Sequence, residues 1–526
     1  MPIPNCLHET YEKDLLPPVT DVLLPPGLEG AREGALAMLA FGGAAEAGVV
    51  AHAAFVPALG PEGYEIDCSE AGVEVRAGGE SAAVYAAATL RQLAAEHGGR
   101  LPACRIADAP RFGWRGLTLD VCRHFFPIGT IYHLLDLMAY YKYNRLHLHL
   151  SDDQGFRFES ERYPLLNSVG SYRASTLEKR GGKVGQNGVH HGGYYRKHEL
   201  VKLVRYAKAR GIEIVPELDL PGHAVAILAA YPALACRMEP LEVATYFGVS
   251  DFSRKLFCAG SDETFAFLCS LLDELMEVFP YEYVHIGGDE AVKTEWKHCP
   301  RCRRVMVAQG LGSERELQGY LLNRVLSYLK ERGRRAIVWN DGLCKNLDPG
   351  AVVQFWTPLF FERARTVRRV NAGGEAIMSR VFNVYYDYPY AFTPLWKTYR
   401  YEPVLRGIRP ESEENVLGVE AAIWTEWIDT EEKLFFNTLP RLAATAETGW
   451  SAKDGKRYSD FLRRLAPHYA LYAALGLNYA RFAENPLSAW QRLGGALTFL
   501  TRDTHAELLQ NQTGGPNGRR NQKEGN

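Results

Sequence analysis

Residues 283–290 read Tyr-Val-His-Ile-Gly-Gly-Asp-Glu, a short apolar run followed by two glycines and two adjacent acids. A strand that is buried on both faces appears in sequence as a continuous apolar run. Residues 283–286 fit that pattern, and the glycines that follow mark the end of the run. The sequence therefore predicts a buried strand with Asp289 and Glu290 at its carboxyl end.

Similar apolar runs recur from Trp114 onward, each followed by a helical pattern. Eight buried strands separated by helices predict an α/β fold, a parallel (β/α)8 TIM barrel. The predicted strands are residues 117–122, 145–150, 213–218, 283–286, 335–339, 352–356, 376–384 and 416–424.

The chain upstream of the barrel has a different composition, rich in Ala and Gly. Short apolar runs at 64–68 and 73–77 precede a helical pattern at 81–96, and Asp108-Ala109-Pro110 breaks the pattern. We expect a small α/β N-terminal domain at 1–110 and the catalytic barrel at 111–475. A C-terminal helical segment and disordered tail are expected at 476–526, because residues 514–526 are polar.

Composition excludes several classes of protein. Lys+Arg 60 against Asp+Glu 62 leaves a net charge of -2, so we expect neither nucleic acid nor a membrane as partner. The N-terminus has no basic start or apolar run, which favours a cytoplasmic protein unless an export signal was removed. For the assembly we expect a monomer or a homodimer. The 10 Cys are scattered through the chain, unlike a dense disulfide framework.

Polar side chains collect where the predicted strands end. In a TIM barrel these ends form the active site. Acids, an Arg and several Trp there indicate a carbohydrate site, since charged groups hold sugar hydroxyls and indole rings cover the C–H faces of a pyranose. His147 and His149 could suggest a metal site, but no compact ligand spacing accompanies them, and we expect neither a metal nor a cofactor.

One further motif, Cys299-Pro300-Arg301-Cys302, looks like half of a zinc ribbon or a redox pair. No second Cys-x-x-Cys follows it. The sequence favours a pair that tightens a loop and has no catalytic role.

The motifs together resemble glycoside hydrolase family 20, the β-N-acetylhexosaminidases, from Trp114 to about Trp427. The most specific is His285-Ile286-Gly287-Gly288-Asp289-Glu290. The others, in the same order as in the family, are Arg115-Gly116, Asp120, Arg123-His124-Phe125-Phe126-Pro127, Lys142-Tyr143-Asn144, His147, His149, Asp152-Asp153-Gln154-Gly155, Pro216-Glu217, Asp219 and Pro221-Gly222-His223.

The resemblance implies substrate-assisted catalysis, for which family 20 is known. Glu290 corresponds to the family's general acid and base, and Asp289 to the residue that orients the substrate's acetamido group. Adjacent carboxylates could not easily flank a sugar from opposite sides, which agrees with a nucleophile supplied by the substrate. Tyr385 corresponds to the tyrosine that binds the acetamido oxygen, although Tyr386 is the neighbouring alternative.

Eight further residues match substrate-binding positions of the family. Each also has a structural alternative: Arg123 could pair with a barrel acid, His223 could fix a loop, Asp152 or more readily Asp153 could cap a turn, and Trp339 or Trp356 could be core. The resemblance implies that the sugar hydroxyls are bound by Arg123, Asp387 and Glu426. It implies that the aromatic wall consists of Trp339, Trp356 and Trp424, and that the acid is supported by Asp152 and His223.

The resemblance thus predicts an exo-acting retaining β-N-acetylhexosaminidase that removes terminal GlcNAc or GalNAc from an oligosaccharide or glycoconjugate. A lacto-N-biosidase or a relative specific for sulfated hexosamines is the alternative within the enzymes. A non-catalytic carbohydrate-binding barrel is a more remote one, because Asp289, Glu290 and Tyr385 are all present.

Overall fold

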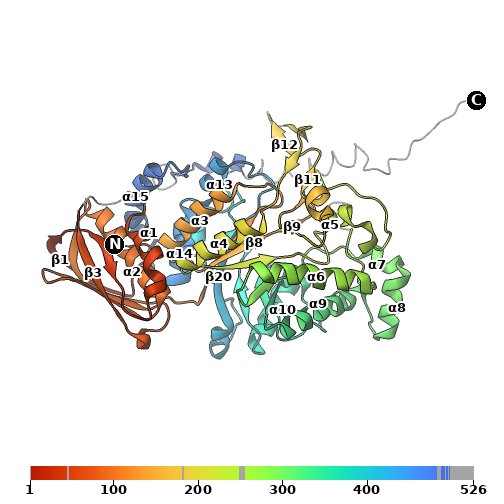
Figure 1. Ribbon diagram of the computed structural model, residues 1–526, viewed down its shortest axis with the longest axis horizontal. Helices are drawn as coiled ribbons and strands as arrows, with labels where there is room; N and C mark the ends of the chain where they lie inside the picture. The colour runs from red at the N-terminus through yellow and green to blue at the C-terminus, as the bar shows by residue number, and fades with distance from the viewer. Residues whose placement is uncertain are drawn as a thin grey trace, which may run out of the picture.

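A computed structural model describes residues 2–43, 47–180, 183–247, 255–481, 487–491, 493–495 and 497. Figure 1 shows an elongated molecule with a mixed sheet at one end and a barrel beyond it. The predicted tail at 514–526 lies outside the described residues. In the described part of the chain no helix is both long and apolar enough to cross a bilayer.

The N-terminal unit is a six-stranded sheet in the order β1-β6-β4-β5-β3-β2. Along β4 buried and half-buried residues alternate, and Tyr64, Ile66 and Cys68 are the buried ones. This period of two is that of a strand with one face packed, here against α2. The elements are β1 His8–Leu16, β2 Val19–Leu23, α1 Arg32–Leu39, β3 Val49–Phe55, β4 Tyr64–Ser69, β5 Gly72–Ala77, α2 Glu80–Glu96 and β6 Leu101–Asp108.

The second unit is a closed barrel of parallel strands in the order β15-β16-β17-β18-β19-β20-β7-β8, which confirms the predicted fold class. Every residue of β7 is buried, as expected of a strand covered on both faces. The strands are β7 Trp114–Asp120, β8 Arg145–His149, β15 Glu213–Glu217, β16 Tyr283–His285, β17 Arg335–Trp339, β18 Val352–Phe355, β19 Ala376–Met378 and β20 Val416–Ile423.

Helices cover the barrel from outside. They are α3 Ile128–Tyr140, α4 Lys197–Ala209, α5 Val225–Ala230, α6 Asp262–Val278, α7 Thr294–His298, α8 Pro300–Ala308, α9 Glu314–Glu331, α10 Phe360–Asn371, α11 Val381–Val384, α12 Leu395–Tyr399, α13 Glu431–Thr438, α14 Arg441–Trp450 and α15 Tyr458–Ala474. The long β8–α4 connection carries three small hairpins, β9 Ser151–Asp152 with β10 Gly155–Phe156, β11 Tyr172–Arg173 with β14 His191–Gly192, and β12 Leu177–Arg180 with β13 Lys183–Gln186.

Two details of the predicted strand-helix alternation are wrong. The seventh strand ends at Met378, and residues 381–384 form a helical turn where a strand was expected. Between β17 and β18 only the short 3-10 helix Asn340–Gly342 is present, because Pro349 and Gly350 in this brief connection favour a turn over a helix. The domain division at 110 and 475 stays a prediction; the sheet ends at Asp108 and the barrel begins at Trp114.

The barrel interior has an apolar layer and a polar layer. A separate apolar cluster consists of residues at the start or the middle of their strands, namely Trp114, Val215, Tyr283, Ile337, Val352 and Ile377. Beyond them, Glu217, His147, His285, Gln354 and Glu420 are also fully buried. The polar layer lies toward the carboxyl ends of the strands, where a TIM barrel has its active site.

A buried ion pair joins the sheet to the barrel. Lys142, after α3, donates to the carboxylate of Asp108 at 2.9 Å and to the hydroxyl of Tyr64 at 2.7 Å. Trp450 donates to the other oxygen of Asp108 at 2.9 Å. The Tyr64 hydroxyl also donates to Asp108, at 2.6 Å, so side chains from three parts of the chain satisfy one carboxylate.

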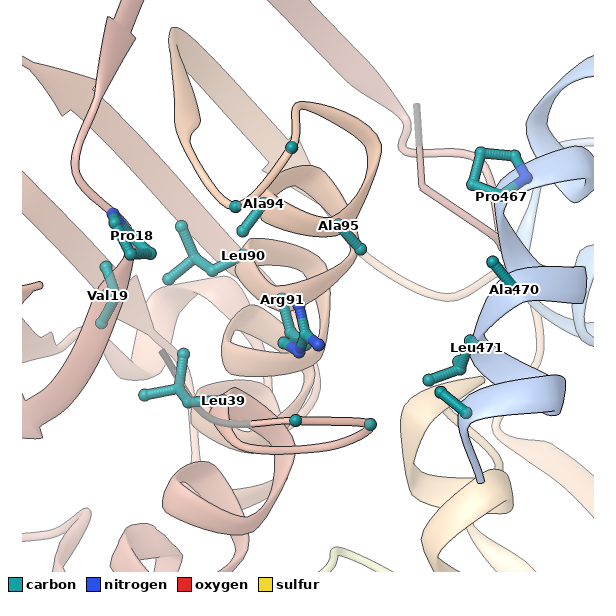
Figure 2. A pocket seen from close by; sticks show the side chains of 15 residues that line it. Pro18, Val19, Leu39, Leu90, Arg91, Ala94, Ala95, Pro467, Ala470 and Leu471 are labelled. Atoms are coloured by element: carbon teal, nitrogen blue, oxygen red, sulfur yellow. The ribbon is translucent and has the colours of Figure 1, made fainter. Parts of the chain in front are cut away.

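A hollow between α2 and α15 lies near the same junction (Figure 2). Apolar side chains such as Leu39, Leu90 and Leu471 line it, and Arg91, the charged residue among its described lining, donates to the Phe41 carbonyl. With no acid or other reactive group in its lining, this hollow is not a candidate active site.

Replacing Asp108 by Asn tests the buried pair. The variant leaves the Lys142 ammonium buried without a counter-charge, which should lower the free energy of unfolding by about 3–5 kcal/mol. Urea denaturation measures the loss. The control is Asp67→Asn at the exposed pair with Arg105, where the expected change is at most about 1 kcal/mol. Equal effects of the two substitutions would contradict a structural role for the buried pair.

Candidate active site

The base of the site is the carboxylate of Glu217, fully buried at the end of β15. His285 Nδ1 lies 2.8 Å from it, Trp339 Nε1 donates to it at 2.9 Å, and His147 Nε2 lies 3.1 Å away. His149 Nδ1 forms a short hydrogen bond with it. Burial opposes the charge, but the histidines outweigh burial and hold the pKa of Glu217 well below its usual value.

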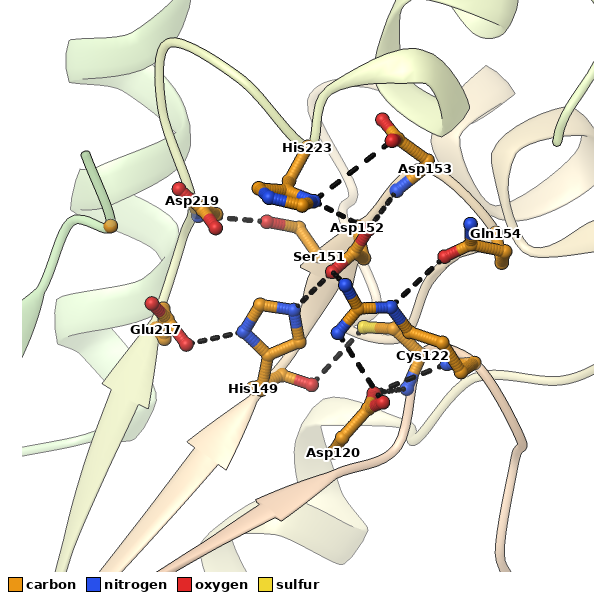
Figure 3. A network of polar contacts seen from close by, with 12 residues as sticks. Asp120, Cys122, His149, Ser151, Asp152, Asp153, Gln154, Glu217, Asp219 and His223 are labelled. Carbon is orange, nitrogen blue, oxygen red and sulfur yellow. Dashed lines mark hydrogen bonds and ion pairs between the residues drawn. The ribbon is translucent and has the colours of Figure 1, made fainter. Parts of the chain in front are cut away.

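His149 links Glu217 to Asp152, as Figure 3 shows. Its Nε2 lies 2.6 Å from Asp152 Oδ2, and the other oxygen of Asp152 lies 3.1 Å from His223 Nδ1. Although burial raises the pKa of Asp152, the charges of Arg123 and His223 lower it well below its usual value. Asp152 is thus an anion that fixes a histidine and an arginine together.

Arg123 lies among acids and one indole ring. Its guanidinium is 2.8 Å from Asp152 and 3.4 Å from Asp120, donates to Gln154 at 3.1 Å, and lies 5.1 Å from the centre of the Trp424 ring. The predicted substrate-binding Arg therefore also makes the barrel contacts that were its structural alternative, while keeping an aromatic neighbour at the barrel opening.

Asp153 has a structural role, but at α5, 72 residues further along the chain, and not at the following turn where the sequence placed it. Its carboxylate accepts the backbone N–H of Val225 at 3.1 Å and so caps the first turn of α5. Burial raises the pKa of Asp153 to about 6.

Asp289 and Glu290 approach one side of the site together. His223 Nε2 lies 3.6 Å from Asp289 Oδ2 and 3.7 Å from Glu290 Oε2. The Glu290 side chain is 34% exposed and that of Asp289 is 13% exposed, so Glu290 is the more accessible of the two. Because both carboxylates reach the same nitrogen, they do not face each other across a sugar-sized space.

Both carboxyl groups have raised pKa values. Burial raises the pKa of Asp289 to about 7; His223 opposes this increase and the neighbouring acid Asp341 adds to it. The pKa of Glu290 is raised for the same reasons, in the same order. Raised carboxyl pKa values in a cleft are typical of groups that exchange protons with a substrate.

The backbone of this segment has an unusual conformation. Glu290 has a φ of 44°, and Gly287 and Gly288 have φ of 64° and 109°. The Glu290 N–H donates to Asp341 Oδ2 at 2.9 Å, which holds the strained residue in place. At Gly287 a Cβ atom would lie 1.6 Å from Asp219 Oδ1, so glycine is required there by space as well as by φ.

The predicted aromatic residues differ in burial. Trp339 is only 1% exposed and lies beneath Trp424, with 5.9 Å between the ring centres, so it forms the floor of the site and no part of an open wall. Trp356 and Trp424 are half-buried and lie on either side of Tyr385, with ring centres 6.4 Å and 6.2 Å from it.

The two neighbouring tyrosines point to different places. The Tyr385 ring lies 6.4 Å and 6.2 Å from the two half-buried indoles and is 5% exposed, whereas Tyr386 is 0% exposed and donates its hydroxyl to Thr445 in α14 at 2.7 Å. Of the two tyrosines, Tyr385 is the one that lies beside the aromatic residues of the predicted site. Asp387 and Glu426 are half-buried, and the charge of Glu426 acts on Arg123.

Comparison with known proteins bears on the family. The model of the glycosyl hydrolase family 20 catalytic domain matches residues 112–453, and the model of domain 2 of that family matches residues 28–109. The chain belongs to glycoside hydrolase family 20. This confirms the family, and the class of hydrolase, that the sequence motifs predicted.

Curated β-hexosaminidases are among its relatives. That of Akkermansia muciniphila is 35% identical over 429 residues, 78% of this chain and 84% of the relative. That of Porphyromonas gingivalis is 34% identical over 471 residues, 86% of this chain, but the match spans only 58% of that longer relative.

Solved structures agree with the fold. The β-N-acetylhexosaminidase of Streptomyces coelicolor has a TM-score of 0.78 at 28% identity, covering 92% of this chain and 98% of that chain. An exo-β-N-acetylglucosaminidase of Vibrio harveyi in complex with N-acetylglucosamine has a TM-score of 0.80 at 26% identity, covering 91% and 78%.

Asp341 is the residue of this family 20 site that the sequence argument did not assign. Asp341 accepts hydrogen bonds from the Glu290 N–H and from Trp356 Nε1, at 2.9 Å each. It thereby joins residues 287–290, the acid segment, to Trp356 of the aromatic wall. Its position directly after the fifth strand, in Trp339-Asn340-Asp341, was the available signal. Glu217 was quoted as part of a motif, but its burial beneath the site was not foreseen.

Gly287→Ala tests the close packing of the acid segment. Gly310 is the matched control, because its φ of 63° is nearly that of Gly287 while nothing lies within 4 Å of its Cβ position. Gly310→Ala should cost about 1–2 kcal/mol for the left-handed backbone alone. Gly287→Ala should cost about 1–3 kcal/mol more, because Asp219 must move. Denaturant unfolding of both variants measures the difference. Equal losses in the free energy of unfolding would show that Asp219 moves aside at no cost in stability.

Proposed function

We propose that this chain is an exo-acting, retaining β-N-acetylhexosaminidase. It removes terminal non-reducing β-linked GlcNAc or GalNAc from oligosaccharides or glycoconjugates. The nucleophile is the acetamido oxygen of the substrate, and an oxazolinium ion is the intermediate.

The observation that carries this proposal is the state of Asp289. Its Oδ1 is buried and accepts no hydrogen bond from any residue that the structure describes. A buried carboxylate oxygen without a donor is costly. A substrate N–H supplies the missing donor, and the acetamido group of an N-acetylhexosamine carries such an N–H.

Glu290 is suited to the proton transfers. Its side chain is the more exposed of the adjacent pair, and burial raises its pKa, so its protonated form persists to higher pH than that of an ordinary glutamate. It donates a proton to the glycosidic oxygen as the bond to the anomeric carbon breaks. It then accepts a proton from the water that opens the intermediate.

The acetamido oxygen forms the new bond to the anomeric carbon as the aglycone alcohol leaves. Asp289 accepts the acetamido N–H and stabilises the positive charge that develops on the group. The Tyr385 hydroxyl donates to the acetamido oxygen from the other side. Water then attacks the anomeric carbon on the face that the aglycone left, so two inversions retain the β configuration.

The remaining predicted residues hold the sugar. Arg123 with Asp387 and Glu426 binds the outer hydroxyls of a terminal residue, which supports exo action. Trp356 and Trp424 cover its apolar faces, while Asp152 and His223 fix the acid pair. The N-acetylglucosamine complex of the Vibrio harveyi relative supports this class of substrate.

Three 4-nitrophenyl β-glycosides test the proposal, those of GlcNAc, GalNAc and glucose. We expect release from the two acetamido sugars and none from glucose, which has a hydroxyl in place of the nucleophile. Similar release from glucose would require a protein nucleophile and overturn the substrate-assisted mechanism. Release from none of the three would favour a larger or sulfated substrate, as for the lacto-N-biosidase alternative, or binding alone.

Glu290→Gln tests the acid. We expect kcat/KM to fall about 10²–10⁴-fold on a disaccharide, whose leaving group needs a proton. The loss should be smaller on the 4-nitrophenyl glycoside. Glu277→Gln on α6, with a side chain 55% exposed, is the control. Equal, small losses on both substrates would remove Glu290 from the role of acid.

The pH profile tests Asp341. The acid form of Glu290 is lost as pH rises through its pKa, which sets the basic limb of kcat/KM. Asp341 raises that pKa, so Asp341→Asn should move the basic limb to lower pH. Asp262→Asn, at a side chain 93% exposed, should leave the limb in place. A limb that does not move in Asp341→Asn would show that this charge does not act on Glu290.

A further inference from the structure

Four cysteines that are far apart in the sequence meet beside the active site. Cys236 and Cys258 precede α6 in the connection that follows β15, and Cys299 and Cys302 begin α8 in the connection that follows β16. Their sulfur atoms all lie within 4.8 Å of one another. Cys258, Cys299 and Cys302 are at most 4% exposed, and Cys236 is half-buried.

The spacing of the sulfurs is that of a tetrahedron around one metal ion. The Sγ–Sγ distance is 3.8 Å for Cys236 and Cys302, for Cys258 and Cys299, and for Cys258 and Cys302. Four thiolates on a tetrahedral zinc ion, each with a Zn–S bond of about 2.3 Å, have edges of about 3.8 Å. A disulfide has an S–S distance of about 2.0 Å, so these cysteines are not bonded in pairs.

The chain is arranged to bring the sulfurs together. Cys299 and Cys302 have the C-x2-C spacing common among zinc ligands. Gly260, two residues after Cys258, packs so tightly on the other pair that a Cβ there would lie 2.4 Å from the Cys302 nitrogen. Arg301 donates to the Ala235 carbonyl at 2.7 Å and brings a positive charge close to Cys258 and Cys299.

We propose that Cys236, Cys258, Cys299 and Cys302 bind a structural zinc ion that clamps the connection after β15 to the connection after β16. The first connection contains His223, and the second contains Asp289 and Glu290 close to the end of β16. All four ligands come from the protein, so the ion has no open position for a substrate. Its role is to hold the acid segment, apart from the chemistry of hydrolysis.

This proposal revises the expectation of no metal. In the sequence, Cys299 and Cys302 do not predict zinc, because no second Cys-x-x-Cys follows them. The fold supplies the other two ligands singly, 22 residues apart in the sequence, at positions 236 and 258. Cys299 and Cys302 still tighten a loop, but together with a metal.

Zinc analysis of the full chain tests the proposal without reference to activity. The protein is purified under reducing conditions from zinc-supplemented medium, desalted and analysed by inductively coupled plasma mass spectrometry. We expect one zinc per chain. Cys302→Ser and Cys236→Ser should each lose most of it, and Cys269→Ser, at a buried thiol of α6 outside the cluster, should keep it.

Thermal unfolding gives a second readout. Incubation of the wild type with a strong zinc chelator should lower Tm, and added zinc should restore it, whereas Tm of Cys302→Ser, already lowered, should not respond to either. If Cys302→Ser fails to fold, the wild-type response and the partly exposed Cys236→Ser carry the test. Wild-type protein with negligible zinc, with iron in its place, or with a disulfide within the cluster by non-reducing peptide mapping would overturn the proposal.

Discussion

A carboxylate buried within a closed barrel is costly unless its charge is compensated, and the order of this active site depends on how Glu217 is compensated. His147, His149 and His285 and the indole of Trp339 surround it. Those partners come from three strands, β8, β16 and β17, so the carboxylate at the end of β15 fixes the ends of four strands relative to one another. Removing one partner of such a network costs more stability than replacing the whole network by apolar residues, because the remaining charged groups stay buried.

The same network separates the carboxyl groups into two kinds. Glu217 and Asp152 have lowered pKa values because positive partners outweigh their burial. Asp289 and Glu290 have raised pKa values because His223 only partly offsets burial and the charge of Asp341. The first kind holds the scaffold as permanent anions, and the second can exchange protons. One histidine, His223, contacts members of both kinds and so joins the scaffold to the acids.

Much of this fold could be predicted from sequence, because the property that marks a barrel strand is local. A run such as 336–339 is apolar because both its faces are covered, and this requirement affects consecutive residues of the sequence. Positions of acids after strands could be predicted for the same reason. Burial of a single side chain could not. Trp339 and Trp356 are alike in sequence, yet one is the floor of the site and the other is half-buried, because their exposure depends on residues contributed by other strands.

Contacts between distant segments were the other limit. The partners of Asp341 lie 51 and 15 residues away along the chain, and those of Cys302 lie 44 and 66 residues away. Such contacts leave no periodic pattern of apolar and polar residues in the sequence. A local motif could point to Asp289 and Glu290 because the two residues are adjacent, whereas a cluster that includes two single cysteines has no local signature beyond the Cys299–Cys302 pair.

The acid segment shows why those distant contacts matter. A non-glycine residue at a φ of 44° stores roughly 1–3 kcal/mol of strain, and such strain persists only where the surroundings hold it. Two contacts restrain this segment: Gly287 packs over Asp219, and Asp341 accepts the Glu290 N–H. The first acts three residues before the strained residue and the second at the strained residue itself, and the zinc proposed at the cysteine cluster would add a third restraint at 299–302. A carboxyl group that must exchange protons can therefore lie partly exposed at the barrel opening without losing its position.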